Sequence, residues 1–297
     1  MSKISTIFIG MTTRNSNDSG TDSPIVFIAN EGGTERIQYT FPDSSQDDQG
    51  QGKANLYEIP VIPGAGLDTT LLANTYFRVG IRESDAWRPE HVFLWGMSEK
   101  PHVIFPLGMR FDASTTLLER EAGGGGFAQP NPEQVVLSTD VNKGDLSFPI
   151  PPVAPGGPAM PIQRLVMMMT TSNKANAGTN SKVNLQVTSA NALLVDFNIP
   201  HTPQDDQQRG QANFYFIPVG DPFMKNQLDP ENSITLSING DDTWLPASFY
   251  LFGLDTADGM ANSAVPLVFI DAWAFNNSLS TDDTEGSASV KLTLTLP

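Results

Sequence analysis

Hydrophobic and polar residues alternate in several segments of this chain. Every second residue is apolar at 77–81, 183–187, 234–238 and 290–296. Such alternation is typical of β-strands that bury one face. Turn residues separate these segments at short intervals, and no segment has a sustained amphipathic helix pattern. The pattern therefore predicts an all-β chain of short antiparallel strands packed as β-sandwiches.

The second half of the chain repeats motifs of the first half in the same order. The pairs are Gly20-Thr21-Asp22-Ser23 with Gly178-Thr179-Asn180-Ser181, Gln46-Asp47-Asp48 with Gln204-Asp205-Asp206, and Asp85-x-Trp87-x-Pro89 with Asp242-x-Trp244-x-Pro246. The spacing is constant for the first two pairs and one residue shorter for the third. A repeat this long predicts two tandem modules, each a complete domain of the same topology.

The expected boundaries follow from the repeat. Module one is predicted at 1–150, a linker at 151–160, and module two at 161–297. The linker is rich in Pro and Gly, which favour a stiff, extended connection over a helix or a central strand. Module one carries an additional loop insertion at 109–148, where four consecutive glycines at 123–126 exclude a packed element.

Charge excludes one class of partner. The chain has 33 acidic and 17 basic residues and a formal net charge of −16. Such a surface repels the phosphates of nucleic acids, so no nucleic-acid partner is expected. It also disfavours direct contact with anionic lipid head groups unless a cation such as Ca²⁺ bridges them.

Motifs of known enzyme chemistry are missing from the sequence. There is no Cys, and the three histidines lack the spacing of metal ligands on one helix. His91 follows Pro89 by two residues and is expected to be a surface residue of a turn. The sequence lacks a GxSxG motif and a P-loop as well. We therefore expect a protein that is not an enzyme.

Two repeated features each allow two interpretations. The small-Gly-Thr-Asp/Asn segments at 19–22 and 177–180 are either ordinary turns or sets of oxygen donors for a hard cation. Trp87 and Trp244 each follow a predicted strand. Each is either a core residue or an aromatic anchor at an edge that binds a partner or lipid.

These motifs, in this order, resemble the PLAT, or lipoxygenase-homology, domain. The [Ala/Ser]-Gly-Thr-[Asp/Asn] turn, a Gly-x-x-[Asn/Asp]-x-[Phe/Tyr] segment and Asp-x-Trp-x-Pro occur in sequence twice, at about 4–108 and 163–297. The resemblance implies an eight-stranded β-sandwich that engages membranes, lipids or partner proteins, in some members with Ca²⁺. Asn180 departs from the family, which often has Asp at this position.

The resemblance also implies Ca²⁺ ligands from two loops, and Ca²⁺ is the one cofactor it suggests. In module one the implied positions are Asp18, Gly20, Asp85 and Ala86, with Asp22 nearby. In module two they are Asn176, Gly178, Asp242 and Thr243, with Asn180 and Asp241 nearby. Because Ca²⁺ affinity rises with the number of carboxylates, the second site is expected to be the weaker.

The leading expectation is a non-enzymatic tandem binding protein that engages a lipid surface or a partner protein, assisted by Ca²⁺ where the ligands allow it. The alternative is a structural subunit whose modules pack on other copies, as a homo-oligomer or a larger assembly. The first ten residues lack the features of a signal peptide, and no segment is apolar enough to span a membrane. The chain is thus expected to be cytoplasmic, or exported without a signal peptide.

Overall fold

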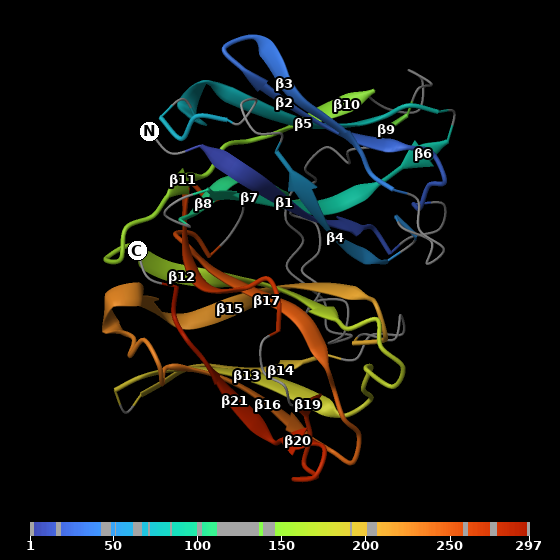
Figure 1. Ribbon diagram of the computed structural model, residues 1–297. Helices are drawn as coiled ribbons and strands as arrows, with labels where there is room; N and C mark the ends of the chain where they lie inside the picture. Colours follow the sequence, from blue (N-terminus) through green and yellow to red (C-terminus); the bar gives the residue numbers. More distant parts are fainter. Residues whose placement is uncertain are drawn as a thin grey trace. The chain divides into compact units, whose positions relative to one another are not determined.

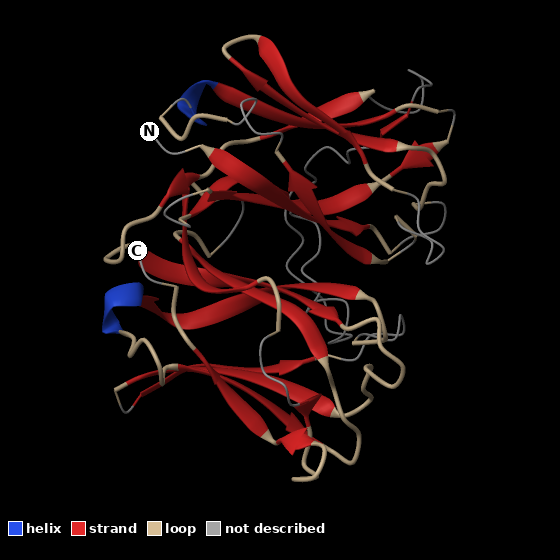
Figure 2. Ribbon diagram, viewed as in Figure 1, coloured by secondary structure: helices blue, strands red, loops and turns tan. Residues whose placement is uncertain are grey.

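The structure is a computed structural model, and it describes residues 3–15, 19–42, 49–50, 52–61, 67–70, 72–83, 85–99, 103–111, 137–138, 146–190, 192–200, 207–257, 261–273 and 278–295. Strands dominate these ranges, where two single-turn 3₁₀ helices, η1 (Leu72–Asn74) and η2 (Lys225–Gln227), are the helical elements (Figure 2). No helix within them is long and apolar enough to cross a bilayer. The all-β prediction is confirmed.

The chain divides into two units, and along the main chain the division falls between Pro155 and Gly156. We keep the names module one and module two for them and describe each by itself. Figure 1 shows each module as two facing layers of strands. Within each layer the neighbouring strands of the four-stranded sheets run antiparallel.

Module one has two four-stranded sheets. The first has the order β4 (Ala54–Pro60), β1 (Ile4–Thr13), β7 (Pro89–Ser98), β8 (Ile104–Phe111). The second has the order β10 (Ser147–Ile150), β5 (Thr75–Ile81), β2 (Ile25–Glu31), β3 (Thr34–Thr40). A short strand, β6 (Ala86–Trp87), pairs with β9 (Leu137–Ser138), and β11 (Ala154–Pro155) ends the module.

Module two has the same arrangement. Its first sheet has the order β15 (Ala212–Met224), β12 (Pro161–Thr171), β17 (Pro246–Leu254), β18 (Ser263–Ile270). Its second sheet has the order β14 (Ala192–Ile199), β13 (Lys182–Ser189), β16 (Ile234–Asn239), β21 (Ser289–Leu292). The short strands β19 (Ser278–Leu279) and β20 (Gly286–Ser287) form a parallel pair. The motif repeat in the sequence thus accompanies a repeated order of strands.

The alternating residues of the sequence form the core between the two sheets of each module. Val183, Leu185 and Val187 of β13 are fully buried, while Asn184 and Gln186 between them face outward. The same holds for Phe77 and Val79 of β5 in module one, which pack with residues of both sheets. Burying one face of each sheet against the other is what stabilises a sandwich.

The predicted insertion at 109–148 is wrong at both ends. Met109 belongs to β8, and Ser147 and Phe148 belong to β10, which pairs with β5 and buries Phe148 in the core. β10 takes the place in module one that β21 has in module two. The pattern missed this strand because it is only four residues long and contains Pro149. The glycines at 123–126 lie outside the described residues.

The predicted linker at 151–160 is also wrong as a separate spacer, because its residues are bonded to the modules. The N–H of Met109 donates to the carbonyl of Pro151 at 3.0 Å, and the N–H of Val153 donates to the carbonyl of Leu107 at 3.2 Å. On the far side, the N–H of Gly156 donates to the carbonyl of Ala264 in module two at 2.7 Å. Pro151 has no backbone N–H to donate, but its carbonyl can still accept a hydrogen bond from an edge strand.

Candidate functional site

The implied ligand positions of module two lie on loops at one end of its sandwich, and these loops are hydrogen-bonded to one another. The N–H of Leu245 donates to the carbonyl of Ala177 at 2.9 Å, and the N–H of Thr179 donates to the carbonyl of Gln207 at 3.2 Å. The hydroxyl of Thr281 donates to the carbonyl of Gly240 at 2.7 Å. We call this the loop end of module two.

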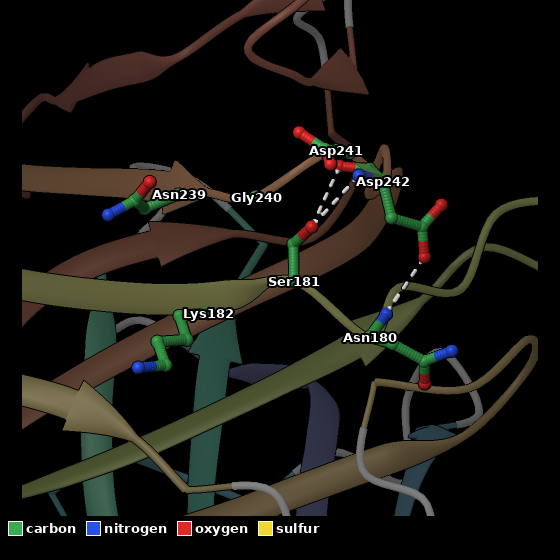
Figure 3. Close-up of a pocket in the computed structure, with 7 residues that line it drawn as sticks. All are labelled: Asn180, Ser181, Lys182, Asn239, Gly240, Asp241 and Asp242. Atoms are coloured by element: carbon green, nitrogen blue, oxygen red, sulfur yellow. Dashed lines mark hydrogen bonds between the residues drawn. The ribbon is translucent and has the colours of Figure 1, made fainter.

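Asp242 connects two of these loops. Its Oδ2 accepts a hydrogen bond of 2.8 Å from the N–H of Asn180, and its Oδ1 accepts one of 2.9 Å from the N–H of Thr243. The N–H of Asp242 donates to Oγ of Ser181 at 2.9 Å. Figure 3 traces the bonds that join Asp242 to Asn180 and Ser181. Both carboxylate oxygens therefore serve as acceptors for the backbone of the loops.

Module one has two of these three hydrogen bonds at the equivalent positions. Oδ2 of Asp85 accepts from the N–H of Asp22 at 3.3 Å, and the N–H of Asp85 donates to Oγ of Ser23 at 3.1 Å. Within the turn, Oγ1 of Thr21 accepts from the N–H of Ser23 at 3.0 Å, as Oγ1 of Thr179 does from the N–H of Ser181. These bonds favour the ordinary-turn interpretation of the small-Gly-Thr-Asp/Asn segments.

Two further implied ligands have a clear backbone role. Asn176 has a φ of 58°, in the left-handed region that Asn tolerates better than most residues. A Cβ added at Gly178 would lie 3.0 Å from the carbonyl oxygen of Gln207 and 3.1 Å from the nitrogen of Arg209. Glycine is therefore needed at 178 for close contact between two loops, and a metal is not required to explain it.

The described residues do not form a ready-made metal site. Across the ranges given above, no group of three or more His, Asp or Glu side chains is placed to hold a metal ion. The structure does bring Asp22 and Asp85 together, but through an N–H donor. Ala86 lies in β6 and pairs with Ser138. Gly20 is half-buried in its turn, and Asp18 lies outside the described residues.

Of the two interpretations of Trp87 and Trp244, the structure supports the core residue, and the assignment of both as edge anchors is wrong. Both indoles have no exposed surface and belong to the cores of their modules. Nε1 of Trp87 donates to Oγ1 of Thr13, and Nε1 of Trp244 to Oγ1 of Thr171, each at 2.9 Å. A buried indole needs such a partner for its N–H, which is why a Thr stands at both positions.

His91 also differs from the expectation of a surface turn. It lies in β7 with 3% of its surface exposed, and its Nδ1 is 3.0 Å from Oγ1 of Thr12 on β1. The proline two residues earlier suggested a turn, but Pro89 instead begins the strand. His91 thus contributes to strand pairing inside module one.

Sequence reasoning named Asp241 and Asp242 but missed that a second acidic loop lies beside them at the loop end of module two. The loops 240–243 and 280–285 carry five exposed carboxylates, those of Asp241, Asp242, Asp282, Asp283 and Glu285. Besides the bond from Thr281 to Gly240, Oγ1 of Thr243 contacts Oγ of Ser280 at 3.1 Å and donates to Oε2 of Glu285. We call these two loops the acidic loop pair. The run Asp282-Asp283-x-Glu285 was the available signal, but it has no counterpart in the repeat.

Asp282 is held in a local turn. The hydroxyl and then the N–H of Thr284 donate to its Oδ1 at 2.7 and 2.8 Å, and these bonds lower the pKa of the Asp282 carboxyl from its ordinary value. The carboxyl is therefore firmly ionised at neutral pH. These bonds form a local turn in the 280–285 loop, whose Thr281 donates to the carbonyl of Gly240.

A polar depression of about 640 Å³ lies beside the acidic loop pair. Its lining comes from the start of β13 and from the chain that follows β16, namely Asn180, Ser181, Lys182, Asn239, Gly240, Asp241 and Asp242 (Figure 3). Such a lining suits a charged or polar contact better than an apolar ligand.

Comparisons with known proteins give little further guidance. No protein-family model matches the chain, and no curated protein matches it. Among solved structures it aligns with the alpha toxin from Clostridium absonum, with a TM-score of 0.35 and 12% identity over 46% of this chain. The match spans 32% of the toxin chain, about a third of its length. This similarity is too distant to support an argument about function.

Proposed function

We propose that this chain is a non-enzymatic binding protein that uses the acidic loop pair of module two to contact a positively charged surface of a partner protein. The observation that supports this is the gathering of five exposed carboxylates on two loops that are hydrogen-bonded to each other. Carboxylates held on fixed loops create a local negative potential that attracts and orients a partner of opposite charge.

The loops are suited to recognition because their conformation is set before any partner arrives. Thr281 bonds to Gly240, Thr243 bonds to Ser280 and Glu285, and Asp242 bonds to Asn180. Loops that are already ordered lose less conformational freedom on binding. Lys182 lines one side of the depression and adds a positive charge there. A partner with charges of both signs would therefore bind in one orientation.

A Ca²⁺-bridged contact with an anionic membrane is the second candidate. It is favoured by the exposed carboxylate oxygens, which are hard ligands for Ca²⁺, and by the resemblance to PLAT domains. Insertion of Trp87 or Trp244 into lipid is no part of this proposal, because both are buried. An anionic membrane would be repelled by a chain of net charge −16 without the ion.

Binding of the full chain to two probes tests the proposal. One probe is a poly-lysine surface, and the other is vesicles that contain phosphatidylserine, with and without Ca²⁺. The test variant combines Asp241→Asn with Asp283→Asn, whose carboxylates take no part in the bonds that join the two loops. The matched control combines Asp221→Asn with Glu231→Gln, two exposed acids of module two outside the acidic loop pair.

The proposal predicts that the test variant binds poly-lysine at least about threefold more weakly than the control, because local rather than net charge decides the contact. Equal weakening in both variants would contradict it. Binding to phosphatidylserine vesicles only with Ca²⁺, and its loss in the test variant, would favour the membrane candidate instead. The poly-lysine contact should also weaken as salt is raised.

A further inference from the structure

Strand β14 is the outer strand of its sheet in module two, paired on one side with β13. Val195, Phe197 and Ile199 face the core, and Asp196 and Asn198 are exposed on the outer face. An outer strand has backbone N–H and C=O groups along its open edge, so it can accept a further strand. Proteins usually guard such edges with charged residues, Pro or bulges.

In module one the equivalent edge strand, β3, is protected by charged residues against pairing with a further strand. Its register is irregular at Glu35 and Arg36, and Nε of Arg36 forms an ion pair of 3.2 Å with Oε2 of Glu31. In β14 the irregularity lies at the equivalent place, but the residues are Leu193 and Leu194. Leu193 is 56% exposed. Module two thus has two leucines at the place where module one has the charged residues Glu35 and Arg36.

The outer face of β14 carries a row of polar side chains with unequal donors and acceptors. Nδ2 of Asn184 donates to Oδ1 of Asp196 at 2.9 Å and to Oδ1 of Asn198 at 3.2 Å, and Nε2 of Gln186 donates to Oδ1 of Asp196 at 3.3 Å. Among the described residues no hydrogen bond engages Nδ2 of Asn198. Asp196 offers a further acceptor, Oδ2, beside it.

We propose that β14 pairs with β14 of a second copy of this chain, antiparallel and about a twofold axis at Phe197. In this register Asp196 of each copy lies opposite Asn198 of the other, and Val195 lies opposite Ile199. Residues opposite each other in an antiparallel pair share one face. Each Asn198 amide then donates to an Asp196 carboxylate across the axis, and no two like charges face each other.

The rest of the edge fits this arrangement. The stretch 195–199 contains no Lys, Arg or Pro, so every residue can take part in pairing. The irregularity beside Leu193 ends the regular ladder and therefore ends the paired stretch. A twofold contact closes on itself and yields a discrete dimer rather than a filament. This inference does not depend on the acidic loop pair.

Sedimentation velocity of the full chain, from micromolar to submillimolar concentration, tests the proposal. The wild type is expected to show a monomer–dimer equilibrium. Asn198→Asp places carboxylates opposite each other and should weaken the dimer by at least about tenfold. The double change Asp196→Asn with Asn198→Asp exchanges donor and acceptor on both copies and should restore the dimer. Thermal unfolding of each variant verifies that module two remains folded.

The matched control is Thr40→Asp, the position on β3 equivalent to Asn198, which should leave the dimer unchanged. Four results would overturn the proposal: a wild type that stays monomeric throughout, a dimer indifferent to Asn198→Asp, a folded double variant that stays monomeric, or loss of the dimer in Thr40→Asp. A wild-type monomer would return β14 to the role of an ordinary sheet edge.

Discussion

Nε1 of Trp244 donates a hydrogen bond of 2.9 Å to Oγ1 of Thr171, and both residues are buried. Trp244 follows β16 in the chain, and Thr171 ends β12 in the opposite sheet. The bond therefore ties the loop before β17 to the end of β12. Trp87 and Thr13 form the same bond in module one. A pair this buried stabilises its module because neither polar group can turn to water.

The first prediction concerns this pair. Thr171→Val keeps the shape of the side chain but leaves the indole N–H without its acceptor, at a cost of about 1–3 kcal/mol in the free energy of unfolding. Trp244→Phe removes the donor and leaves a cavity, at a cost of about 2–4 kcal/mol. Urea unfolding followed by circular dichroism measures both.

The double variant decides whether the two residues act through their bond. Once Trp244 is Phe, Thr171→Val has no indole N–H to strand, so the combined cost should be smaller than the sum of the two single costs. Thr235→Val, on the outer face of β16, is the control and should leave stability nearly unchanged. Strict additivity of the two changes would mean that the bond contributes nothing.

The strands could be predicted from the sequence where one face is buried and the other is exposed to solvent. In β13, Val183 and Leu185 alternate with Asn184 and Gln186, and the structure buries the first pair only. Likewise Ile234 and Leu236 of β16 were identified by their alternation. Successive side chains along a strand point to opposite faces of the sheet, which gives a period of two residues. The alternation in the sequence therefore indicates directly which face is buried.

Other parts depended on contacts that a local pattern does not contain. β10 is short and includes Pro149, so its pairing with β5 is visible only in three dimensions. The two tryptophans were compatible with either a core or an edge, and the acceptors on Thr13 and Thr171 decided for the core. The acidic loop pair forms because Thr281 reaches Gly240, which lies far away in the sequence.

The second prediction concerns Gly178. A methyl group there would lie 3.0 Å from the carbonyl oxygen of Gln207, a distance at which the backbone of one loop must move. Gly178→Ala should lower the free energy of unfolding of module two by about 1–3 kcal/mol. The matched control is Gly220→Ala in β15, where a methyl group would have no neighbour within 4 Å. That change should be neutral or stabilise by up to about 1 kcal/mol. Equal effects in thermal unfolding would refute the close-contact role of Gly178.

The third prediction concerns Ca²⁺. The resemblance to PLAT domains predicts Ca²⁺ binding in both modules, with module one the stronger. In module two, both carboxylate oxygens of Asp242 already accept hydrogen bonds from N–H groups, so we expect millimolar affinity for Ca²⁺ there at best.

Calorimetric titration of the full chain with Ca²⁺ should give a binding heat that Asp85→Asn reduces more than Asp242→Asn does. Titration with Mg²⁺ is the control for general screening. Absence of heat at millimolar Ca²⁺ would remove the ion from the proposed function.

The fourth prediction concerns pH and the acidic loop pair. Hydrogen bonds from the hydroxyl and the N–H of Thr284 lower the pKa of Asp282 below its ordinary value of 3.8. A carboxyl whose pKa is lower in the folded state than in the unfolded state stabilises the fold above the unfolded value, and this contribution is lost as the pH falls through the folded value. The stability advantage of the wild type over Asp282→Asn should therefore be constant near neutral pH and shrink below about pH 3.8.

Thr284→Ala removes the hydroxyl that contributes most to the lowered pKa of Asp282 and should make the pH dependence of stability shallower. Thermal unfolding between pH 7 and pH 2 measures all three proteins, and an advantage that persists unchanged at the lowest pH would show that the turn does not hold the ionised carboxyl.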